Sequence, residues 1–212
     1  LCCASATSTT TTEPAAASLL ETAPNDRRTV IEVSPILGVG RDQFVVDLTA
    51  SLGLPPWDAS ATHPREEDYN QHVATLKGWL LQDQEFWYHG SEKVEPCDLL
   101  SPERHFIHVK KGLATSALRH LFGQASGSAD LFSRHQPFVD EMKKRFETKW
   151  PGTPFESAGR PRVVLAIARP PGGDLLGKML LSRINILEHA RRVQRRGFGF
   201  AVCRIDLVGG GA

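Results

Sequence analysis

Runs of apolar residues, separated by turns rich in Gly and Pro, predict strands in the second half of the chain. The run RVVLAIA at 162–168 is almost unbroken, which is typical of a strand buried on both faces of a sheet. The run HFIHVKK at 105–111 alternates instead, so His108 and Lys110 share one face of the predicted strand. A last strand is predicted over 198–208, where FGFAVCRIDLV is again mostly apolar.

Helical spacing of apolar residues marks the segments around these strands. The segment after Pro64 places Tyr69 and Val73 four residues apart, and its acidic residues lie in the first turn, where the helix dipole favours them. In a later segment Phe138 begins an amphipathic stripe, and in another Gly127 predicts an interruption. The predicted helices cover 65–81, 115–132, 137–150 and 179–197.

The order of these elements predicts the fold class. Runs at 85–89 and 93–100 precede the strand at 105–111, and three strands in a row predict an antiparallel meander. The alternation of helix and strand after them predicts crossover connections onto the same sheet. Near the start, 29–35 and 43–49 predict a short hairpin. The predicted fold is therefore α/β, with a mixed central sheet flanked by helices.

Composition divides the 212 residues into three parts. Residues 1–28 are rich in Ala, Ser and Thr and predict a low-complexity leader without fixed structure. Residues 29–63 contain the short hairpin and a loop broken by prolines, and we interpret them as the remnant of a preceding domain. Residues 64–208 carry the remaining pattern and predict one α/β domain.

The balance of charge excludes a polycationic protein and leaves room for a local basic patch. Lys and Arg number 25 and Asp and Glu number 24, for a net charge of +1. Binding to nucleic acid would therefore depend on clusters such as RRVQRR at 191–196. The residues predicted to contact nucleic acid are Lys111, Gln124, Arg191, Arg192 and Arg195.

The four cysteines do not form a structural zinc pattern, because none belongs to paired CxxC motifs. Cys97 and Cys203 lie in apolar stretches, which predicts buried thiols in a reducing compartment such as the cytoplasm. No apolar run in the sequence approaches the roughly 20 residues that span a membrane.

Asp98, His108 and Lys110 form the strongest candidate for a chemical site. The turn SPER joins the two strands that carry them and would bring the three side chains together. Asp98 offers a hard oxygen ligand for a divalent cation, and Lys110 offers a positive charge that could stabilise a phosphate. The simpler alternative is an ion pair between Asp98 and Lys110 across the hairpin.

This arrangement resembles the catalytic motif of the restriction-endonuclease-like fold, whose core is a helix, three strands, a helix and a strand. The resemblance covers residues 64–168. It implies phosphodiester cleavage with a divalent metal, magnesium or manganese, and with Asp98, His108 and Lys110 as catalytic residues.

The sequence departs from that motif at His108, which stands where the fold usually has a carboxylate. An imidazole can bind a metal, although it suits zinc better than magnesium. Glu66 or Glu67, on the preceding helix, is the predicted replacement, so the implied metal ligands are Asp98, Glu67 and His108. Glu95 is a weaker candidate for this replacement, because in a regular strand it would face away from Asp98.

A closer resemblance is to an uncharacterised family of sporadically distributed microbial proteins. In that family a His at position 108 is ordinary, whereas Arg119 and Gly123 stand where the family has Ser and Ala. The family is generally longer than this chain, and in this segment it is similar to restriction-endonuclease-like proteins. The stretches that carry the resemblance are EEDYNQHVA at 66–74, VEPCDLLSPERHFIHVKKG at 94–112, TSALRHLFGQASGSADLF at 115–132, RVVLAIA at 162–168 and LLSRINILEHARRVQRRGFGFAVCRIDL at 180–207.

Two functional hypotheses follow from these resemblances. The first is a metal-dependent nuclease or DNA-processing domain, with genome defence as the expected setting and DNA as the favoured partner. The second is a catalytically inactive relative with the same fold, which binds nucleic acid or a protein partner. The replacement of a carboxylate by His108 is what favours the second hypothesis.

Overall fold

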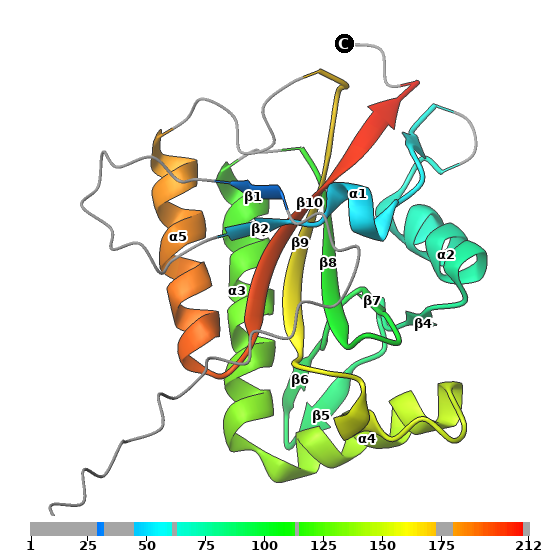
Figure 1. Cartoon of the computed structure of the whole chain (residues 1–212), viewed down its shortest axis with the longest axis vertical. Helices are drawn as coiled ribbons and strands as arrows, with labels where there is room; N and C mark the ends of the chain where they lie inside the picture. The colour runs from blue at the N-terminus through cyan, green and yellow to red at the C-terminus, as the bar shows by residue number, and fades with distance from the viewer. Residues whose placement is uncertain (1–28, 32–44, 61–62, 113–114, 173–179, 210–212) are drawn as a thin grey trace, which may run out of the picture.

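The computed structural model describes residues 29–31, 45–60, 63–112, 115–172 and 180–209. A mixed eight-stranded sheet lies between layers of helices, as Figure 1 shows. Across the sheet the strands are β1 (Thr29–Ile31), β2 (Val45–Asp47), β10 (Gly199–Val208), β9 (Arg162–Arg169), β8 (His105–Lys111), β7 (Leu99–Leu100) and β4 (Leu80–Leu81), and β3 (Trp57–Asp58) also pairs with β10. The prediction of an α/β protein with a mixed, helix-flanked sheet is confirmed.

The centre of the sheet is parallel. β9 lies between β8 and β10 and pairs in parallel with both. The six residues from Val163 to Ala168 are buried, as the unbroken apolar run predicts for a strand covered on both faces. Helices follow β8 and β9 and provide the crossover connections that parallel neighbours need.

One face of the sheet is covered by α2 (Glu66–Lys77) and by the single turn α1 (Thr49–Leu52). Tyr69 of α2 stacks on Trp57 with ring centroids 4.7 Å apart, and its hydroxyl donates to the carbonyl of Pro55 at 2.9 Å. Gly78 ends the helix with a φ of +67°, a conformation that glycine adopts without strain. The predicted helix is thus confirmed, although it ends before Leu80 and Leu81, which form β4.

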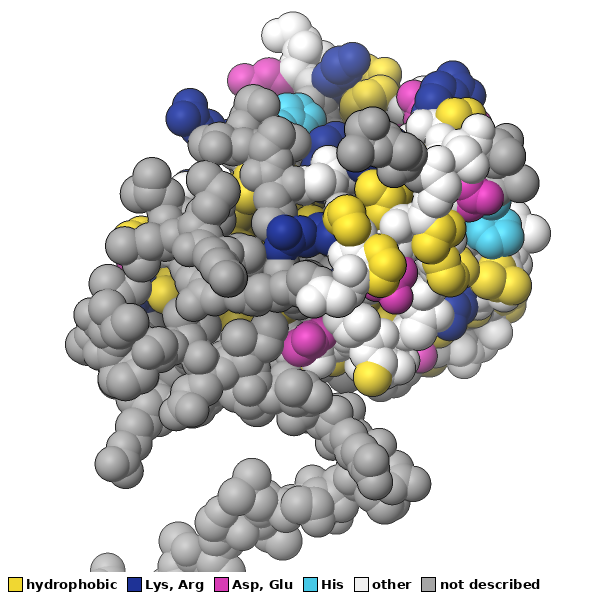
Figure 2. All heavy atoms as spheres, turned by 90° about the horizontal axis from the view of Figure 1, so that it is seen from above, with side chains coloured by type: hydrophobic (Ala, Val, Ile, Leu, Met, Phe, Trp, Pro, Cys, Tyr) yellow, Lys and Arg dark blue, Asp and Glu magenta, His cyan; other side chains and the backbone are white. Residues whose placement is uncertain are grey.

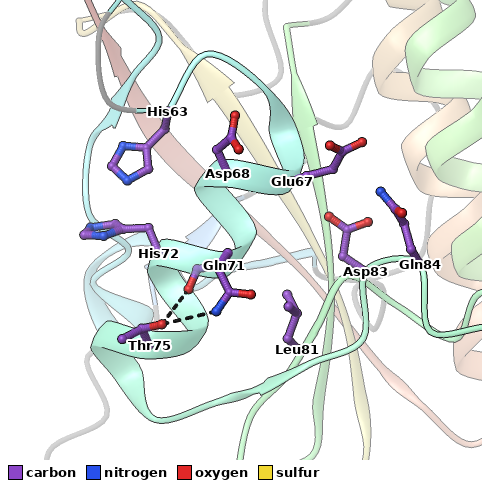
Figure 3. Close-up of a pocket in the computed structure, with 9 residues that line it drawn as sticks. All are labelled: His63, Glu67, Asp68, Gln71, His72, Thr75, Leu81, Asp83 and Gln84. Atoms are coloured by element: carbon purple, nitrogen blue, oxygen red, sulfur yellow. Dashed lines mark hydrogen bonds between the residues drawn. The ribbon is translucent and has the colours of Figure 1, made fainter.

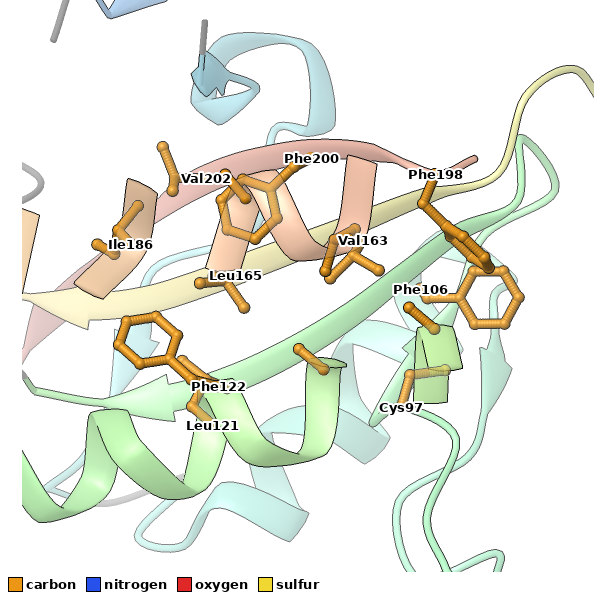
Figure 4. Close-up of a cluster of buried hydrophobic side chains, with 14 of the residues drawn as sticks. Cys97, Phe106, Leu121, Phe122, Val163, Leu165, Ile186, Phe198, Phe200 and Val202 are labelled. Atoms are coloured by element: carbon orange, nitrogen blue, oxygen red, sulfur yellow. The ribbon is translucent and has the colours of Figure 1, made fainter. Parts of the chain in front are cut away.

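The other face is covered by α3 (Thr115–Arg134), α4 (Gln136–Lys149) and α5 (Leu180–Arg195), with a 3₁₀ turn η2 (Phe155–Ser157). Figure 4 shows part of this core, where Phe122 of α3 and Ile186 of α5 lie against Leu165 and Val202 of the sheet. The predicted interruption at Gly127 is wrong, because α3 is continuous. A single glycine costs a helix only about 1 kcal/mol, which the buried face of α3 easily outweighs.

The predicted meander differs from the observed one in its strands. Residues 85–89 lie outside the observed meander, because β5 (Trp87–His89) and β6 (Glu92–Val94) form a separate hairpin. Of the predicted strand at 93–100, only Leu99–Leu100 joins the meander, as β7. The meander consists of β4, β7 and β8. Pro96 explains the break between β6 and β7, because proline cannot donate a ladder hydrogen bond.

The strands of the N-terminal part join the same sheet. β1 pairs antiparallel with β2, as predicted, while residues 32–44 between them and the leader at 1–28 lie outside the described residues. β2 and β3 both pair in parallel with β10. Residues 29–63 therefore contribute three strands to the sheet that residues 64–208 complete.

Cys97 and Cys203 are buried free thiols, as the apolar surroundings of both residues predict. Burial raises the pKa of the Cys97 thiol well above its ordinary value and that of Cys203 to about 12. Both thiols therefore stay protonated and unreactive at neutral pH.

The surface is mixed in charge. On the described part of the face seen in Figure 2, basic, acidic and histidine side chains are interspersed among polar and hydrophobic ones. This pattern fits the net charge of +1. Among the helices of the described residues, none has both the length and the apolarity needed to cross a membrane.

Candidate functional site

The candidate site lies at an edge of the sheet, where β7 begins. Within β8, only Phe106 and Ile107 pair with β7. In the described residues the C-terminal half of β8 therefore has no strand on that side. The segment before β7 fills this gap: the Asp98 N–H donates to the Ile107 carbonyl at 3.0 Å. The turn after β4 joins it, since the N–H groups of Gln82 and Asp83 both donate to the Asp98 carbonyl.

Three carboxylates meet in this gap. Asp83, Glu95 and Asp98 each offer one oxygen atom, and these atoms lie within 4.8 Å of one another. Asp98 is only 6% exposed, and the other two are partly buried. We call these three residues the acidic cluster.

Each member of the acidic cluster is held in place by a neutral donor. The Val109 N–H of β8 donates to Asp98 Oδ2 at 2.5 Å, and Asn70 Nδ2 of α2 donates to Asp83 Oδ2 at 2.9 Å. Glu95 accepts at both oxygens, from the Gln84 N–H at 2.7 Å and from Gln124 Nε2 of α3 at 3.0 Å. The cluster is thus bound to α2 on one side of the sheet and to α3 on the other.

Burial and mutual repulsion raise the pKa values of two of these carboxyls. Burial is the main cause for Asp98, whose pKa lies well above its ordinary value, and the charges of Glu95, Glu66 and Asp83 add to it. The pKa of Glu95 is raised by burial and by the charges of Asp83 and Glu66. Both carboxyls therefore favour either a proton or a cation beside them.

The oxygen atoms that the acidic cluster offers suit a hard divalent cation. Three carboxylate oxygens are the kind of ligand that magnesium, manganese and calcium prefer. Asn70 is fully buried, and its Oδ1 has no hydrogen-bond partner among the described residues. Because Nδ2 of the same amide contacts Asp83, this oxygen is an uncharged potential metal ligand beside the cluster. The residues present therefore fit such an ion.

Lys110 lies next to this cluster but is paired with another residue. Its Nζ contacts Glu66 Oε1 at 2.9 Å, and both side chains are about a quarter exposed, at 26% and 29%. In the described part of the chain, the ion pair of Lys110 is with Glu66 and not with Asp98. The simpler explanation of the motif, an ion pair across the hairpin, is therefore wrong.

His108 lies on the face of β8 that carries Phe106 and is opposite Leu165 of β9, so it faces the core under α3 and α5. Its side chain is only 1% exposed, and burial lowers its pKa to about 3. His108 is not a member of the acidic cluster. The imidazole is neutral at physiological pH, and its Nε2 is buried without a hydrogen-bond partner among the described residues.

We expect His108→Leu to make the fold less sensitive to acid. The folded-state pKa lies below the unfolded value of 6.5, so His108 costs no stability above pH 6.5 and destabilises the fold as the pH falls toward 3. At about 1.4 kcal/mol per pH unit, the variant should gain roughly 3 kcal/mol over the wild type at pH 4 relative to pH 8. Urea unfolding at both pH values measures this difference, and an equal change at both would contradict it.

Of the three predicted metal ligands, the structure brings only Asp98 into the acidic cluster. Glu67 lines a hollow of about 540 Å³ that Asp83 also lines. Figure 3 shows Glu67 on the side of this hollow toward Asp83 and Gln84, away from His63 and His72. It also forms an ion pair with Arg65 at 3.2 Å.

The prediction that Glu95 faces away from Asp98 is wrong. It assumed a regular strand through both residues, whereas the chain leaves β6 at Val94 and enters β7 at Leu99. Asp83 was not a candidate at all, because nothing in its local pattern sets it apart. Pro96 is the sequence signal that could have revealed the irregular backbone around Glu95.

The residues predicted to contact nucleic acid come from three elements, β8, α3 and α5. Gln124 donates a hydrogen bond to Glu95 of the acidic cluster, and Lys111 is exposed at the end of β8. The arginines lie on α5, which packs beside α3. Arg191 pairs with Glu188, Arg192 pairs with Asp130, and Arg195 is exposed.

The fold and the site together define a mixed α/β protein with a buried acidic cluster at the edge of its sheet. Comparison with family models identifies the chain further. Residues 40–206 match the model of a family of unknown function, DUF6119, and the chain belongs to this family. Searches of curated proteins and of solved structures found no match.

Proposed function

We propose that the protein is a metal-dependent nuclease whose metal site is the acidic cluster. The observation that carries this proposal is the convergence of Asp83, Glu95 and Asp98 at the edge of β8, beside the ion pair of Lys110. The order α2, β4, β7, β8, α3 and β9 supports it, because this is the order of elements in the restriction-endonuclease-like core.

The carboxylate that His108 replaces is compensated by the other two members of the cluster. Glu95 and Asp83 approach Asp98 from the loop before β7 and from the turn after β4. His108 would then act by filling the core beneath the site and not as a ligand. This explains how the motif could work with an imidazole in place of a carboxylate.

Each side chain then has a defined task in hydrolysis. A divalent cation held by the cluster would polarise a phosphodiester and supply an activated water molecule. Lys110 would stabilise the developing negative charge on the phosphate, for which its ammonium group must leave Glu66. Glu66, once released, would be a solvent-accessible carboxylate that can accept a proton from the attacking water.

The test is cleavage of supercoiled plasmid, single-stranded DNA and RNA in the presence of Mg²⁺, Mn²⁺ or Zn²⁺. We expect cleavage with Mg²⁺ or Mn²⁺, and a loss of about 100-fold or more in rate for Lys110→Met. Lys144→Met, at an exposed position on α4, is the matched control and should cleave normally. Cleavage that Lys110→Met leaves unchanged would refute the assignment of this site.

The second candidate function is binding without cleavage. The observation in its favour is that Lys110 is already neutralised by Glu66 while His108 occupies the usual carboxylate position. It predicts that binding to nucleic acid weakens with salt and that no divalent metal produces cleavage. Genome defence remains the expected setting for either function.

A further inference from the structure

A second hollow, of about 710 Å³, reaches the acidic cluster from the side of α3. Glu95 lines it, and Asp83 lines the hollow on the side of α2. Because oxygen atoms of Asp83 and Glu95 lie within 4.8 Å of each other, the acidic cluster lies between the two hollows. We call the hollow on the side of α3 the α3 groove.

Charge distinguishes the two hollows. Lys93 and Arg119 line the α3 groove together with His120, and among the described residues Glu95 is its only acidic lining residue. The α2 hollow is lined by Glu67, Asp68 and Asp83 and, in the part of the chain that the structure describes, by no Lys or Arg. Arg65 pairs with Glu67 and Asp68 and offsets part of their charge, so we expect a polyanion to favour the α3 groove over the α2 hollow.

Aromatic side chains stand at the wall of the α3 groove. Phe86 lines it, and Lys93 Nζ lies over the Phe86 ring at 4.4 Å from its centroid. Tyr88 of β5 contacts Phe86 edge-on at 6.4 Å and is 66% exposed. An exposed aromatic ring next to a cation is the arrangement on which unpaired bases stack while the cation meets a phosphate.

The floor of the groove is the surface of α3 at Gly123 and Gly127, one helical turn apart. A Cβ atom at either position would meet nothing within 4 Å, so packing does not require glycine there. Alanine would be the more stable choice in a helix. Glycine instead leaves the backbone of α3 bare toward the groove, which makes room for a flat ligand.

We propose that the α3 groove binds an unpaired strand of nucleic acid and leads it to the acidic cluster. Lys93 and Arg119 would meet its phosphates, and the exposed ring of Tyr88 would stack on a base beside Phe86, whose ring lies under Lys93. This inference rests on the proposed function, because it assigns the substrate class of the same site. A duplex would bind more weakly, since its bases are already stacked on one another and cannot reach these rings.

The experiment separates binding from cleavage. Fluorescence anisotropy would measure the affinity of the Asp98→Asn protein, in EDTA, for labelled single-stranded DNA, single-stranded RNA and a DNA duplex of the same sequence. We expect both single strands to bind at least about tenfold more tightly than the duplex. Arg119→Ala should lower the slope of log affinity against log salt by about 0.7.

Matched substitutions on α3 test the floor of the groove. Gly127→Glu should lower single-strand affinity about tenfold or more, because it adds bulk and negative charge where the strand passes. Gly127→Ala should lower the affinity much less than Gly127→Glu, because it adds only one methyl group, and should raise the melting temperature. Tyr88→Ala should weaken binding about tenfold. Lys144→Glu, on the exposed side of α4, changes the charge more than Gly127→Glu does, yet it should change the affinity less than twofold.

The outcomes distinguish this inference from the proposed function. The assignment of the α3 groove would be overturned, even if the protein cleaves DNA, by either of two results. One is single-strand binding that is unchanged in Arg119→Ala, Gly127→Glu and Tyr88→Ala, and the other is binding that requires the arginines of α5 instead. Single-strand binding that depends on the groove, without cleavage in any metal, would support the groove and refute the nuclease. Preferential binding of the duplex would also overturn it.

Discussion

Asp98→Asn is expected to abolish the stabilisation of the protein by divalent cations. In the wild type, Mn²⁺ at 100 times its dissociation constant should raise the free energy of unfolding by about 2.7 kcal/mol. Removing a residue that only hydrogen-bonds to a metal ligand typically lowers metal affinity about 10- to 100-fold. Removing a ligand itself should therefore lower metal affinity at least about 100-fold. The measurement is the melting temperature with EDTA and with increasing Mn²⁺ or Mg²⁺.

The same substitution should stabilise the metal-free protein at neutral pH. The folded-state pKa of Asp98 lies above its ordinary value of 3.8, so its contribution to stability is intact below pH 3.8 and is lost as the pH rises through the raised value. Asparagine keeps an oxygen that can accept from the Val109 N–H and removes the charge. In EDTA, the advantage of Asp98→Asn over the wild type should therefore grow from pH 4 to pH 8.

Two controls make this prediction specific. Glu95→Gln should behave in the same way, because the pKa of Glu95 is raised for the same reasons. Asp140→Asn, on the exposed side of α4, should leave the response to Mn²⁺ unchanged. If Asp98→Asn destabilised the protein at pH 8 in EDTA and still responded to Mn²⁺ like the wild type, the acidic cluster would not be a metal site.

The sequence was sufficient to predict the helices and strands whose apolar pattern matches the side chains that the fold buries. The unbroken run of β9 and the stripe of Phe138, Met142 and Phe146 on α4 are such cases, and the structure buries all of these side chains. Asp98 was found through the motif that it forms with His108 and Lys110 on two predicted strands joined by the turn SPER. Where local pattern and tertiary packing demand the same structure, a single sequence is informative.

The parts that escaped prediction depend on contacts distant along the chain. β4 has only two residues, and its place in the meander comes from pairing with β7, which no local pattern reveals. Asp83 and Glu95 meet because the turn after β4 bonds to the Asp98 backbone and because Pro96 ends β6. Irregular backbone of this kind has no period, so the proposed metal ligands on it could not be predicted from spacing.

We expect Trp57→Ala to lower the free energy of unfolding by about 3–5 kcal/mol, the cost of removing a buried tryptophan. Trp57 is 1% exposed, stacks on Tyr69 and donates from Nε1 to the His63 carbonyl at 2.6 Å. The residue lies in the segment that we interpreted as the remnant of a preceding domain, yet its ring stacks on Tyr69 of α2 and its strand pairs with β10. Urea unfolding followed by circular dichroism would measure this loss.

Tyr69→Phe is the matched comparison, because it keeps the stacked ring and removes only the hydrogen bond to Pro55. It should cost about 1 kcal/mol. α2 also carries Glu66 and Asn70, so Trp57→Ala should weaken the response to Mn²⁺ as well, whereas Tyr69→Phe should preserve it. If Trp57→Ala left both stability and the response unchanged, residues 45–63 would be dispensable for the fold. A loss of both would mean that these residues and the acidic cluster belong to one cooperative unit.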